Sequence, residues 1–380
     1  MQALKGRFLF LFFLIIEGGL VQAQETNLET SIDSLIGIAQ FEEAKKLLHQ
    51  LPTKQLFYHE RMAQVALAMG ESPLAIKSYQ ALRSLDSSNL KYLNSLARLE
   101  AQRSNYLKAS QYYRELMLQD STNAYYWKQL GALSLKRAHL PLALAYFSTA
   151  YALNSADIEV IAQLSKLYLE MRLFTNADSL IADGLNRDSA NAALWMLNCQ
   201  SAYRQKEYKR MSASADALLN LQIDSSAFYL RHKGIAAYHL GAYNKTITCL
   251  ERLLQAEGKS ELTAFYLGMA YRATNELELA KEYLQTSVDE AISDQIGTYY
   301  LNLALVCEEQ KDYAQAIPAY QKAYQAKALN VINYYLACCY DAYYKDKGVA
   351  IEYFERYLAQ SEAKETEYVD YAQKRVSALK

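Results

Sequence analysis

Residues 124–157 read AYYWKQLGALSLKRAHLPLALAYFSTAYALNSAD, and this stretch decides the fold. It contains two apolar stripes with helical spacing. The first stripe recurs at i, i+3, i+4 and i+7 and consists of Trp127, Leu130, Gly131 and Ser134. The second stripe consists of Ala143, Phe147 and Ala150. The turn-forming residues 154–157 then close the stretch, which therefore predicts two amphipathic helices joined as a hairpin.

The chain repeats this hairpin about every 34 residues. Small residues recur at one position of the expected first helix in each repeat, and we call this series a ladder. Successive members are 34 residues apart, with one or two extra residues at two later places. They are Ala63, Ala97, Gly131, Ser165, Cys199, Gly234, Gly268, Ala304 and Cys338. A second ladder passes through Ala143: Ala75, Ala109, Ala143, Ala177, Met211, Thr246, Ala280, Ala316 and Ala350. Helices approach closely where facing side chains are small, so these two ladders predict the crossing inside each hairpin. A period of this length indicates an array of stacked units.

The repeats resemble those of tetratricopeptide-repeat (TPR) proteins. One unit matches that family's pattern with Trp127-x2-Leu130-Gly131, Ala143, Phe147 and Ala150, and another matches it with Leu267-Gly268-x2-Tyr271 and Ala280. The resemblance covers about residues 25–364 and implies an all-α fold, a right-handed α-solenoid of about ten TPR-like helical hairpins. Serine replaces the family's usual proline at the unit ends, at Ser87, Ser121, Ser155 and Ser189. Each following Asn or Asp is placed to cap the next helix.

The two ends of the chain differ from the repeats. Residues 1–23 have a basic start, the apolar run Phe8–Ile16 and a small-x-small site at Val21–Ala23, which predict a secretory signal peptide. We therefore expect an exported protein, most simply in a bacterial periplasm, although secretion to the medium stays open. Residues 24–364 form the expected solenoid. Residues 365–380 form an expected C-terminal capping helix, with Tyr368, Tyr371 and Ala372 facing inward.

Charge and motifs point away from several classes of function. The net charge is −1, and removing the leader with Lys5, Arg7 and Glu17 leaves −2, which provides no bulk attraction to nucleic acid. The glycines occur singly, and the five histidines form no metal-binding motif, so we expect no cofactor and no metal. Glu308-Glu309 is the notable carboxylate pair, interpreted as a solvated face. The five cysteines are interpreted mainly as space-fillers, with a Cys307–Cys338 bridge left open.

The resemblance implies where a partner would bind. In TPR proteins, the first helices of successive units line a groove that binds extended peptides or a partner helix. First-helix positions outside the stripe that packs against the second helix carry basic and aromatic residues in the third to eighth units. We call this row of residues the track. Its candidate binding residues are Asn94, Arg98, Lys128, Lys166, Tyr203, Arg231, Tyr238 and Arg272. This track favours an acidic or carboxylate-ended segment, with Tyr203 and Tyr238 as anchors. The alternative is an ordinary solvated helix face.

The function expected from the sequence is therefore a non-catalytic scaffold or adaptor of the cell envelope that binds protein segments in its groove. The 33 tyrosines leave a second hypothesis, in which a tyrosine-rich surface binds envelope polysaccharide. A third hypothesis is a hidden enzyme site, which a loss of activity on mutating Glu308, His239 or Cys339 would support. The sequence does not identify the partner.

Overall fold

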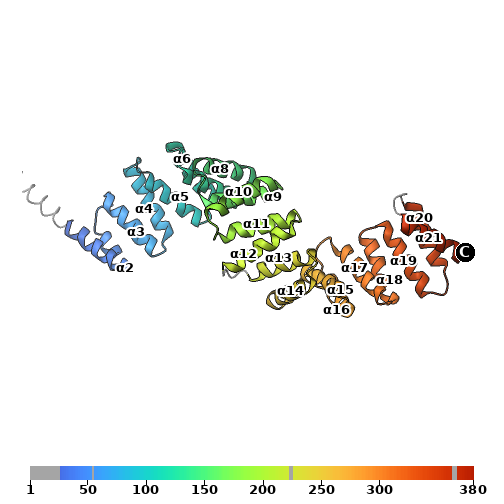
Figure 1. Ribbon diagram of the computed structural model, residues 1–380. Helices are drawn as coiled ribbons and strands as arrows, with labels where there is room; N and C mark the ends of the chain where they lie inside the picture. Colours follow the sequence, from blue (N-terminus) through green and yellow to red (C-terminus); the bar gives the residue numbers. More distant parts are fainter. Residues whose placement is uncertain (1–25, 54, 222–225, 362–365) are drawn as a thin grey trace, which may run out of the picture. The chain divides into compact units, whose positions relative to one another are not determined.

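The computed structural model describes residues 26–53, 55–221, 226–361 and 366–380, and every regular element in these ranges is a helix. The expected signal peptide at residues 1–23 lies outside the described residues. Helices pair in order as antiparallel hairpins (Figure 1), which makes the fold all-α and built from TPR-type helical hairpins. Within the described residues, a helix over 26–37 pairs with α2, and the pairs α3/α4, α5/α6 and α7/α8 follow, as do α11/α12 through α19/α20; α9 and α10 lie between them in the sequence.

The first helices of the hairpins are α3 (Leu56–Ala68), α5 (Leu90–Gln102), α7 (Ala124–Lys136), α9 (Ile158–Glu170), α11 (Ala192–Arg204), α13 (Ser226–His239), α15 (Glu261–Ala273), α17 (Ile296–Glu309) and α19 (Asn330–Tyr343). The second helices are α2 (Phe41–Leu48), α4 (Ser72–Leu85), α6 (Tyr106–Gln119), α8 (Leu140–Leu153), α10 (Phe174–Arg187), α12 (Tyr208–Asn220), α14 (Tyr243–Glu257), α16 (Leu277–Asp289), α18 (Tyr313–Ala326) and α20 (Gly348–Gln360). A last helix, α21 (Thr366–Leu379), follows.

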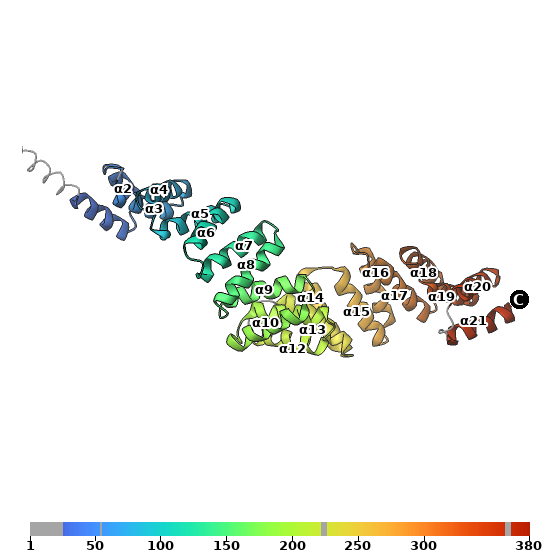
Figure 2. The same cartoon turned by 90° about the horizontal axis from the view of Figure 1, so that it is seen from above.

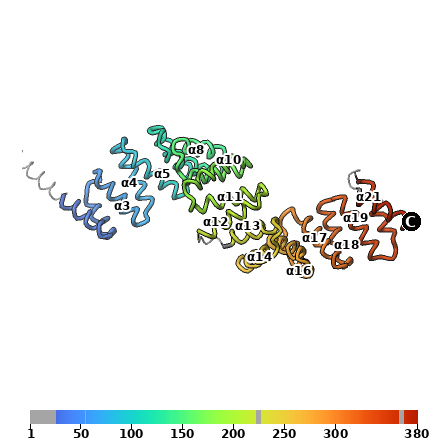
Figure 3. The backbone as a smooth tube through the Cα atoms, in the orientation of Figure 1, coloured from blue at the N-terminus to red at the C-terminus, as the bar shows by residue number. Residues whose placement is uncertain are grey.

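The chain divides into two compact units. Unit 1 ends at Leu167, inside α9, and unit 2 runs from Tyr168 to Lys380. Within unit 1, each hairpin from α3 to α8 packs on the next (Figure 2). Within unit 2, the same stacking continues from α10 to α20, where successive helices lie side by side in the tube trace (Figure 3). Each unit is therefore a row of hairpins that contact their neighbours in sequence.

Small residues at the helix crossings bring the two helices of a hairpin together. A Cβ atom added to Gly131 would lie 2.9 Å from Cγ of Phe147, and one added to Gly268 would lie 2.7 Å from Cγ of Leu284. Glycine at these two positions therefore lets a large side chain of the second helix contact the first-helix backbone. Phe147 and Leu284 are both buried.

The last rung of the small-residue ladder was assigned to the wrong residue. Ala337 is fully buried, whereas Cys338 keeps partial exposure. The cause is the length of the connecting turn. The turn between α17 and α18 spans residues 310–312, but that between α19 and α20 spans 344–347. The extra residue shifts the ladder by one position, so Ala337 occupies the crossing.

The turn inside nearly every hairpin has one backbone conformation that the sequence did not reveal. Its middle residue has a positive φ, in the left-handed region. These residues are Ala39, Gly70, Ser104, Ala138, Arg172, Lys206, Gly241, Asn275 and Lys311. The next amide then donates to the carbonyl five residues back, as Asn105 N does to Glu100 O at 2.8 Å. This is the Schellman end of a helix. Because most of these residues are not glycine, composition alone gave no sign of it.

The junctions between hairpins have the capping chemistry expected from the sequence. The Oδ1 atoms of Asn89, Asn123 and Asn191 accept hydrogen bonds from backbone amides in the next helix. Oδ1 of Asp157 accepts from the amides of Glu159 and Val160 at 3.0 and 3.2 Å. A cap satisfies amides that lack a partner in the first turn of a helix. Pro73 and Pro141 lie in the first turns of α4 and α8, where a missing backbone N–H costs no intrahelical hydrogen bond.

Ion pairs connect residues about one repeat apart in sequence. Four examples are Lys45–Glu71 at 2.6 Å, Arg61–Asp33 at 2.5 Å, Lys128–Asp157 at 2.9 Å and Lys281–Asp312 at 2.9 Å. Each pair joins a hairpin to the next one along the chain. Partly exposed pairs of this kind stabilise by about 1 kcal/mol each. They join neighbouring hairpins in one register.

The C-terminal helix packs through a stripe that the sequence predicted in part: Ala372 faces inward as expected, but the two tyrosines do not. Ala372 and Val376 are buried against α19 and α20, but Tyr368 and Tyr371 remain 41% and 47% exposed. Their rings lie against Tyr334 at centroid distances of 4.8 and 6.0 Å. Ala372 and Val376 thus form the buried part of the interface, and the two phenol rings lie at its edge against Tyr334.

Arg375 anchors α21 to α19 through an ion pair with Asp341. Its Nε donates to Oδ2 of buried Asp341 at 2.5 Å, and Nη2 donates to Oδ1 at 3.1 Å. The hydrogen bonds from Arg375, followed by that from Lys347, hold the pKa of Asp341 below its usual value. A two-point pair of this kind fixes the orientation of the guanidinium as well as its position.

Candidate functional site

Unit 1 contains a groove between its first helices α7 and α9. It encloses a cavity of about 400 Å³. Its floor is apolar, formed by Ala132, Leu135 and Phe147, and its walls carry polar side chains. The wall residues are Lys128, Gln129, Lys136, Glu159, Gln163 and Lys166. We name this cavity and its lining the lysine groove.

The three lysines of the lysine groove are not equivalent. Lys128 Nζ lies 2.9 Å from Oδ2 of Asp157 and 3.0 Å from Oε2 of Glu159. Burial would lower the pKa of Lys128, but its hydrogen bonds to these two carboxylates outweigh burial and raise it. Lys136 and Lys166 are exposed and have no ion-pair partner within the residues that the structure describes. Two cations are therefore available to a ligand in this groove.

A smaller pocket repeats the same design two units earlier. It has a volume of about 110 Å³ and is lined by Leu67, Tyr79, Ser95, Arg98, Leu99 and Gln102. Two repeats of 34 residues separate Arg98 from Lys166, so the two cations hold equivalent positions. The same separation makes Tyr79 equivalent to Phe147. Arg98 is exposed and has no ion-pair partner in the described chain. A cation over an aromatic floor therefore recurs along unit 1.

Asn94 contributes less to this surface than its sequence position suggested. The side chain is only partly exposed, and its Oδ1 atom is buried with no hydrogen-bond partner among the described residues. Asn94 therefore lies at the edge of the packing between helices. Its role as a binding residue stays a prediction.

In unit 2, the predicted cations are already paired with carboxylates. Arg231 forms an ion pair with Glu257 at the end of α14. Arg272 Nε donates to both carboxylate oxygens of Glu309, at 3.0 and 3.1 Å. Glu257 and Glu309 neutralise these two arginines. The row of candidate binding residues therefore carries less positive charge in unit 2 than the sequence suggested.

Aromatic side chains from α11, α12, α13, α15 and α17 of unit 2 lie close together. Tyr208 and His239 stack at a centroid distance of 3.9 Å, and Tyr238 contacts Tyr266 at 5.3 Å. Tyr203 contacts the ring of His232 at 6.3 Å, seven residues before His239 on α13. We name this set the aromatic ridge: Tyr203, Tyr208, His232, Tyr238, His239, Phe265, Tyr266 and Tyr299.

The phenol groups of the aromatic ridge lie near enough to affect one another's ionisation. Burial raises the pKa of Tyr266, and the neighbouring phenols of Tyr203, Tyr208, Tyr238 and Tyr299 raise it further. Nε2 of His239 lies 3.2 Å from the Tyr266 hydroxyl. Burial, followed by the charge of Lys206, lowers the pKa of His239. The ridge thus contains a neutral imidazole near neutral pH, beside several phenols.

Glu308 does not lie on a solvated face. It is partly buried and accepts a hydrogen bond from the hydroxyl of Tyr320. Burial raises the pKa of Glu308, and the Tyr320 hydrogen bond opposes that shift. Glu309, its neighbour, is exposed and pairs with Arg272. The two carboxylates therefore have separate partners, an arrangement that packing and ion pairing explain.

The five cysteines are free thiols. Burial raises the pKa of Cys199 to about 12. A buried thiol with so high a pKa is a poor nucleophile at neutral pH, because the thiolate is the reactive form. In the described ranges, no group of three or more His, Cys, Asp or Glu side chains could hold a metal ion.

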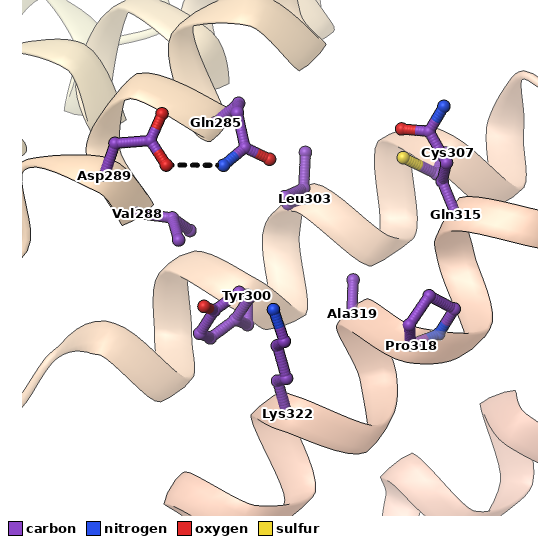
Figure 4. Close-up of a pocket in the computed structure, with 10 residues that line it drawn as sticks. All are labelled: Gln285, Val288, Asp289, Tyr300, Leu303, Cys307, Gln315, Pro318, Ala319 and Lys322. Atoms are coloured by element: carbon purple, nitrogen blue, oxygen red, sulfur yellow. Dashed lines mark hydrogen bonds between the residues drawn. The ribbon is translucent and has the colours of Figure 1, made fainter.

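A further pocket lies between α16, α17 and α18 (Figure 4). Its volume is about 270 Å³. Gln285 donates to Asp289 at 2.7 Å, and Lys322 Nζ lies 5.1 Å from the ring centroid of Tyr300. Pro318, which lies inside α18, forms part of its wall. Gln285 and Lys322 already contact other side chains of this pocket. The pocket therefore offers a ligand fewer unpaired polar side chains than the lysine groove does.

Among the helices that the structure describes, none combines the length and the apolar character needed to cross a bilayer. No protein-family model matches the chain, and no curated protein matches its sequence.

Several solved structures are similar to this chain. A tetratricopeptide repeat protein from Parabacteroides merdae is 12% identical, with a TM-score of 0.46 over 65% of this chain and 98% of that one. A chain of the APC/C hetero-tetramer Cut9–Hcn1 is 13% identical, with a TM-score of 0.48 over 92% of this chain and 83% of that one. The type IV pilus biogenesis factor PilW is 14% identical, with a TM-score of 0.46 over 54% and 93%. At these identities, nothing about this chain's partners follows from them.

Proposed function

We propose that this protein is a non-catalytic scaffold that binds an extended, acidic segment of a partner protein in the lysine groove of unit 1. The observation that carries this proposal is the pair of unpaired cations, Lys136 and Lys166, above the apolar floor of Leu135 and Phe147. Grooves between stacked repeats are the usual binding surfaces of such arrays.

The shape and charge of the groove suit an extended chain. Carboxylates of a bound segment would pair with Lys136 and Lys166, and Gln129 and Gln163 offer amide donors and acceptors to its backbone. Apolar side chains of the segment would contact Phe147. Lys128 would stay with Asp157 and Glu159 and so keep the groove wall in place.

We place this function in a cell envelope because of the signal peptide expected at residues 1–23. Expression of the full chain in a bacterium, followed by mass spectrometry of the periplasmic fraction, tests this location. A mature N-terminus near Gln24 in that fraction would support export. An unprocessed chain that stays in the cytoplasm would refute it, without bearing on the groove.

Binding is tested with a labelled acidic peptide that has a free C-terminal carboxylate, titrated with residues 24–380. We expect saturable binding that weakens with added salt, because the pairs are partly exposed. The Lys136→Glu/Lys166→Glu variant should weaken binding by about tenfold or more. The matched control is Lys46→Glu/Lys77→Glu, which makes the same charge change at exposed lysines of second helices. Equal binding by both variants would show that bulk charge, and not the groove, attracts the peptide.

A further inference from the structure

We propose that a pocket in unit 2 binds a uronic acid unit of an acidic polysaccharide, a class of ligand different from the protein segment proposed for the lysine groove. The pocket lies at the end of α9, beside the start of α10 and the end of α11, and has a volume of about 560 Å³. Its lining consists of Glu170, Arg172, Phe174 and Arg204. Sites for small ligands usually enclose about 300–1,000 Å³, so a sugar unit fits this volume. We name this cavity and its lining the arginine pocket.

The local fold brings the two arginines of the pocket to the same end of α9. The carbonyl oxygen of Leu169, in the last turn of α9, accepts a hydrogen bond from the backbone amide of Arg172 at 3.1 Å. The same oxygen accepts from Nη1 of Arg204 at 2.5 Å. A guanidinium has five N–H groups, so the other N–H groups of Arg204 are available to a ligand. The bond to Leu169 fixes the position from which they donate.

Both guanidiniums lack a carboxylate partner. Arg172 and Arg204 are exposed, and neither forms an ion pair within the part of the chain that the structure describes. They differ in this respect from Arg231 and Arg272 of the same unit, which are already paired with carboxylates. A guanidinium binds a carboxylate or a phosphate through two parallel hydrogen bonds. The arginine pocket therefore has the chemistry of an anion site.

Glu170 determines which anion suits the pocket. It is exposed and has no hydrogen-bond or ion-pair partner among the described residues. An ionised carboxylate only accepts hydrogen bonds, so Glu170 requires a donor on the ligand. A phosphate group carries a charge of about −1.5 to −2 at neutral pH and would be repelled by Glu170. A uronic acid has a single carboxylate and several hydroxyl groups on one ring, so its carboxylate would pair with the arginines while a hydroxyl donates to Glu170.

Phe174 provides a surface for the sugar ring itself. Its side chain is partly exposed, and within the described ranges no other aromatic ring and no cation lies against it. The face of an aromatic ring carries partial negative charge, which attracts the C–H groups on one face of a sugar ring. Each of the four lining residues thus has a counterpart on a uronic acid. A neutral sugar would leave both guanidiniums without a partner.

The test uses residues 24–380 and three labelled oligosaccharides that contain uronic acids: an oligogalacturonide, an oligomannuronide and a hyaluronan fragment. We expect at least one of them to bind saturably, with an affinity that falls as salt is added. The methyl ester of that oligosaccharide keeps its hydroxyl groups but loses its charge, so it should bind about tenfold or more weakly. No binding of any of the three, or equal binding of the ester, would overturn the proposal.

Substitutions then locate the site. Arg172→Gln should weaken binding of the oligosaccharide by about tenfold or more, because it removes one of the two charged donors. Phe174→Leu keeps an apolar side chain but removes the ring, and should also weaken binding. The matched control is Lys311→Gln, which removes a positive charge from another exposed turn residue with the same left-handed backbone, at φ of 62°. Equal affinities of Arg172→Gln and Lys311→Gln would show that bulk charge attracts the ligand and would refute the site.

The role of Glu170 has its own measurement. Inorganic phosphate should not displace the oligosaccharide from the wild type, whereas it should do so from Glu170→Gln, which lacks the repelling charge. Displacement from the wild type would show that the pocket takes any anion and would overturn its assignment to a uronic acid.

The lysine-groove variant Lys136→Glu/Lys166→Glu separates this proposal from the proposed function. It should bind the oligosaccharide as the wild type does, and Arg172→Gln should bind the acidic peptide as the wild type does. Displacement of the oligosaccharide by the acidic peptide would show that the two ligands share one site, and the arginine pocket would then not be a separate sugar site.

Discussion

The crossing of α15 and α16 gives a sharp test of how a small residue holds a hairpin together. Replacing Gly268 by alanine would put a Cβ atom 2.7 Å from Cγ of Leu284 and 3.1 Å from the carbonyl oxygen of Ala280. Carbon atoms in good contact lie about 3.5–4.0 Å apart, so the two helices must separate by about 1 Å. The carbonyl oxygen is backbone and cannot rotate away.

The expected size of the effect follows from two opposing contributions. Overpacking a buried contact costs about 1–3 kcal/mol. Alanine in a helix interior is about 1 kcal/mol more favourable than glycine. With a backbone atom in the way, we place the cost in the upper part of its range, so Gly268→Ala should lower the free energy of unfolding by about 1–2 kcal/mol.

A double-mutant cycle with Leu284 isolates the cause. Leu284→Ala alone should cost about 2–5 kcal/mol through the cavity it leaves. In that background Gly268→Ala meets only the Ala280 carbonyl oxygen, at 3.1 Å, so its cost should fall by about 1–2 kcal/mol, and this difference is the coupling free energy. Urea unfolding followed by circular dichroism measures the four stabilities, and hydrogen exchange of α15 and α16 provides the local measurement. If Gly268→Ala stabilises the protein with Leu284 present, the crossing does not depend on a small residue.

The remaining predictions concern turns, caps and the C-terminal anchor. Ala138 has φ of 56°, so Ala138→Gly should relieve left-handed strain and stabilise the chain by about 0.5–1 kcal/mol in urea unfolding, whereas Ala132→Gly in the interior of α7 should destabilise it by about 1 kcal/mol. Asn123→Ala removes the cap of α7 and should cost about 1 kcal/mol, seen as faster hydrogen exchange in its first turn. The hydrogen bonds from Arg375 lower the pKa of Asp341 in the folded protein. This pairing therefore stabilises the fold fully at pH values above the unfolded pKa of about 3.9. The stabilisation is lost as the pH falls through the lower folded pKa, where the carboxylate is protonated. Asp341→Asn should therefore speed proteolysis of α21 at neutral pH, and the difference from wild type should vanish in acid; a difference that persists in acid would contradict the ion-pair mechanism.

The repeat and its caps could be predicted from the sequence because both depend on local chemistry. A small residue every 34 positions marks a helix crossing wherever the chain folds back on itself, and Asn89 or Asp157 caps the helix that begins immediately after it. These features need no knowledge of distant residues. They were sufficient to give the fold class and the order of the hairpins.

The candidate site was harder to predict because its charges depend on partners elsewhere in the chain. The sequence pattern indicates that Arg272 is an available cation. In the structure, Glu309 lies beside it although it is 37 residues later in the chain. Lys166 looked the same in the sequence and remained unpaired. The position of Ala337 was missed for a similar reason, since a single extra residue in the turn before α20 shifts the ladder without a change in composition.

The ion pairs between neighbouring hairpins also bear on how the chain is made. Lys45 finds Glu71, and Lys281 finds Asp312, without any help from the far end of the protein. Contacts of such short sequence separation give a low contact order, which favours rapid folding. A hairpin emerging from the ribosome can therefore dock on the one before it as soon as its own residues are free. Folding can proceed in the order of synthesis, with each completed hairpin serving as the template for the next.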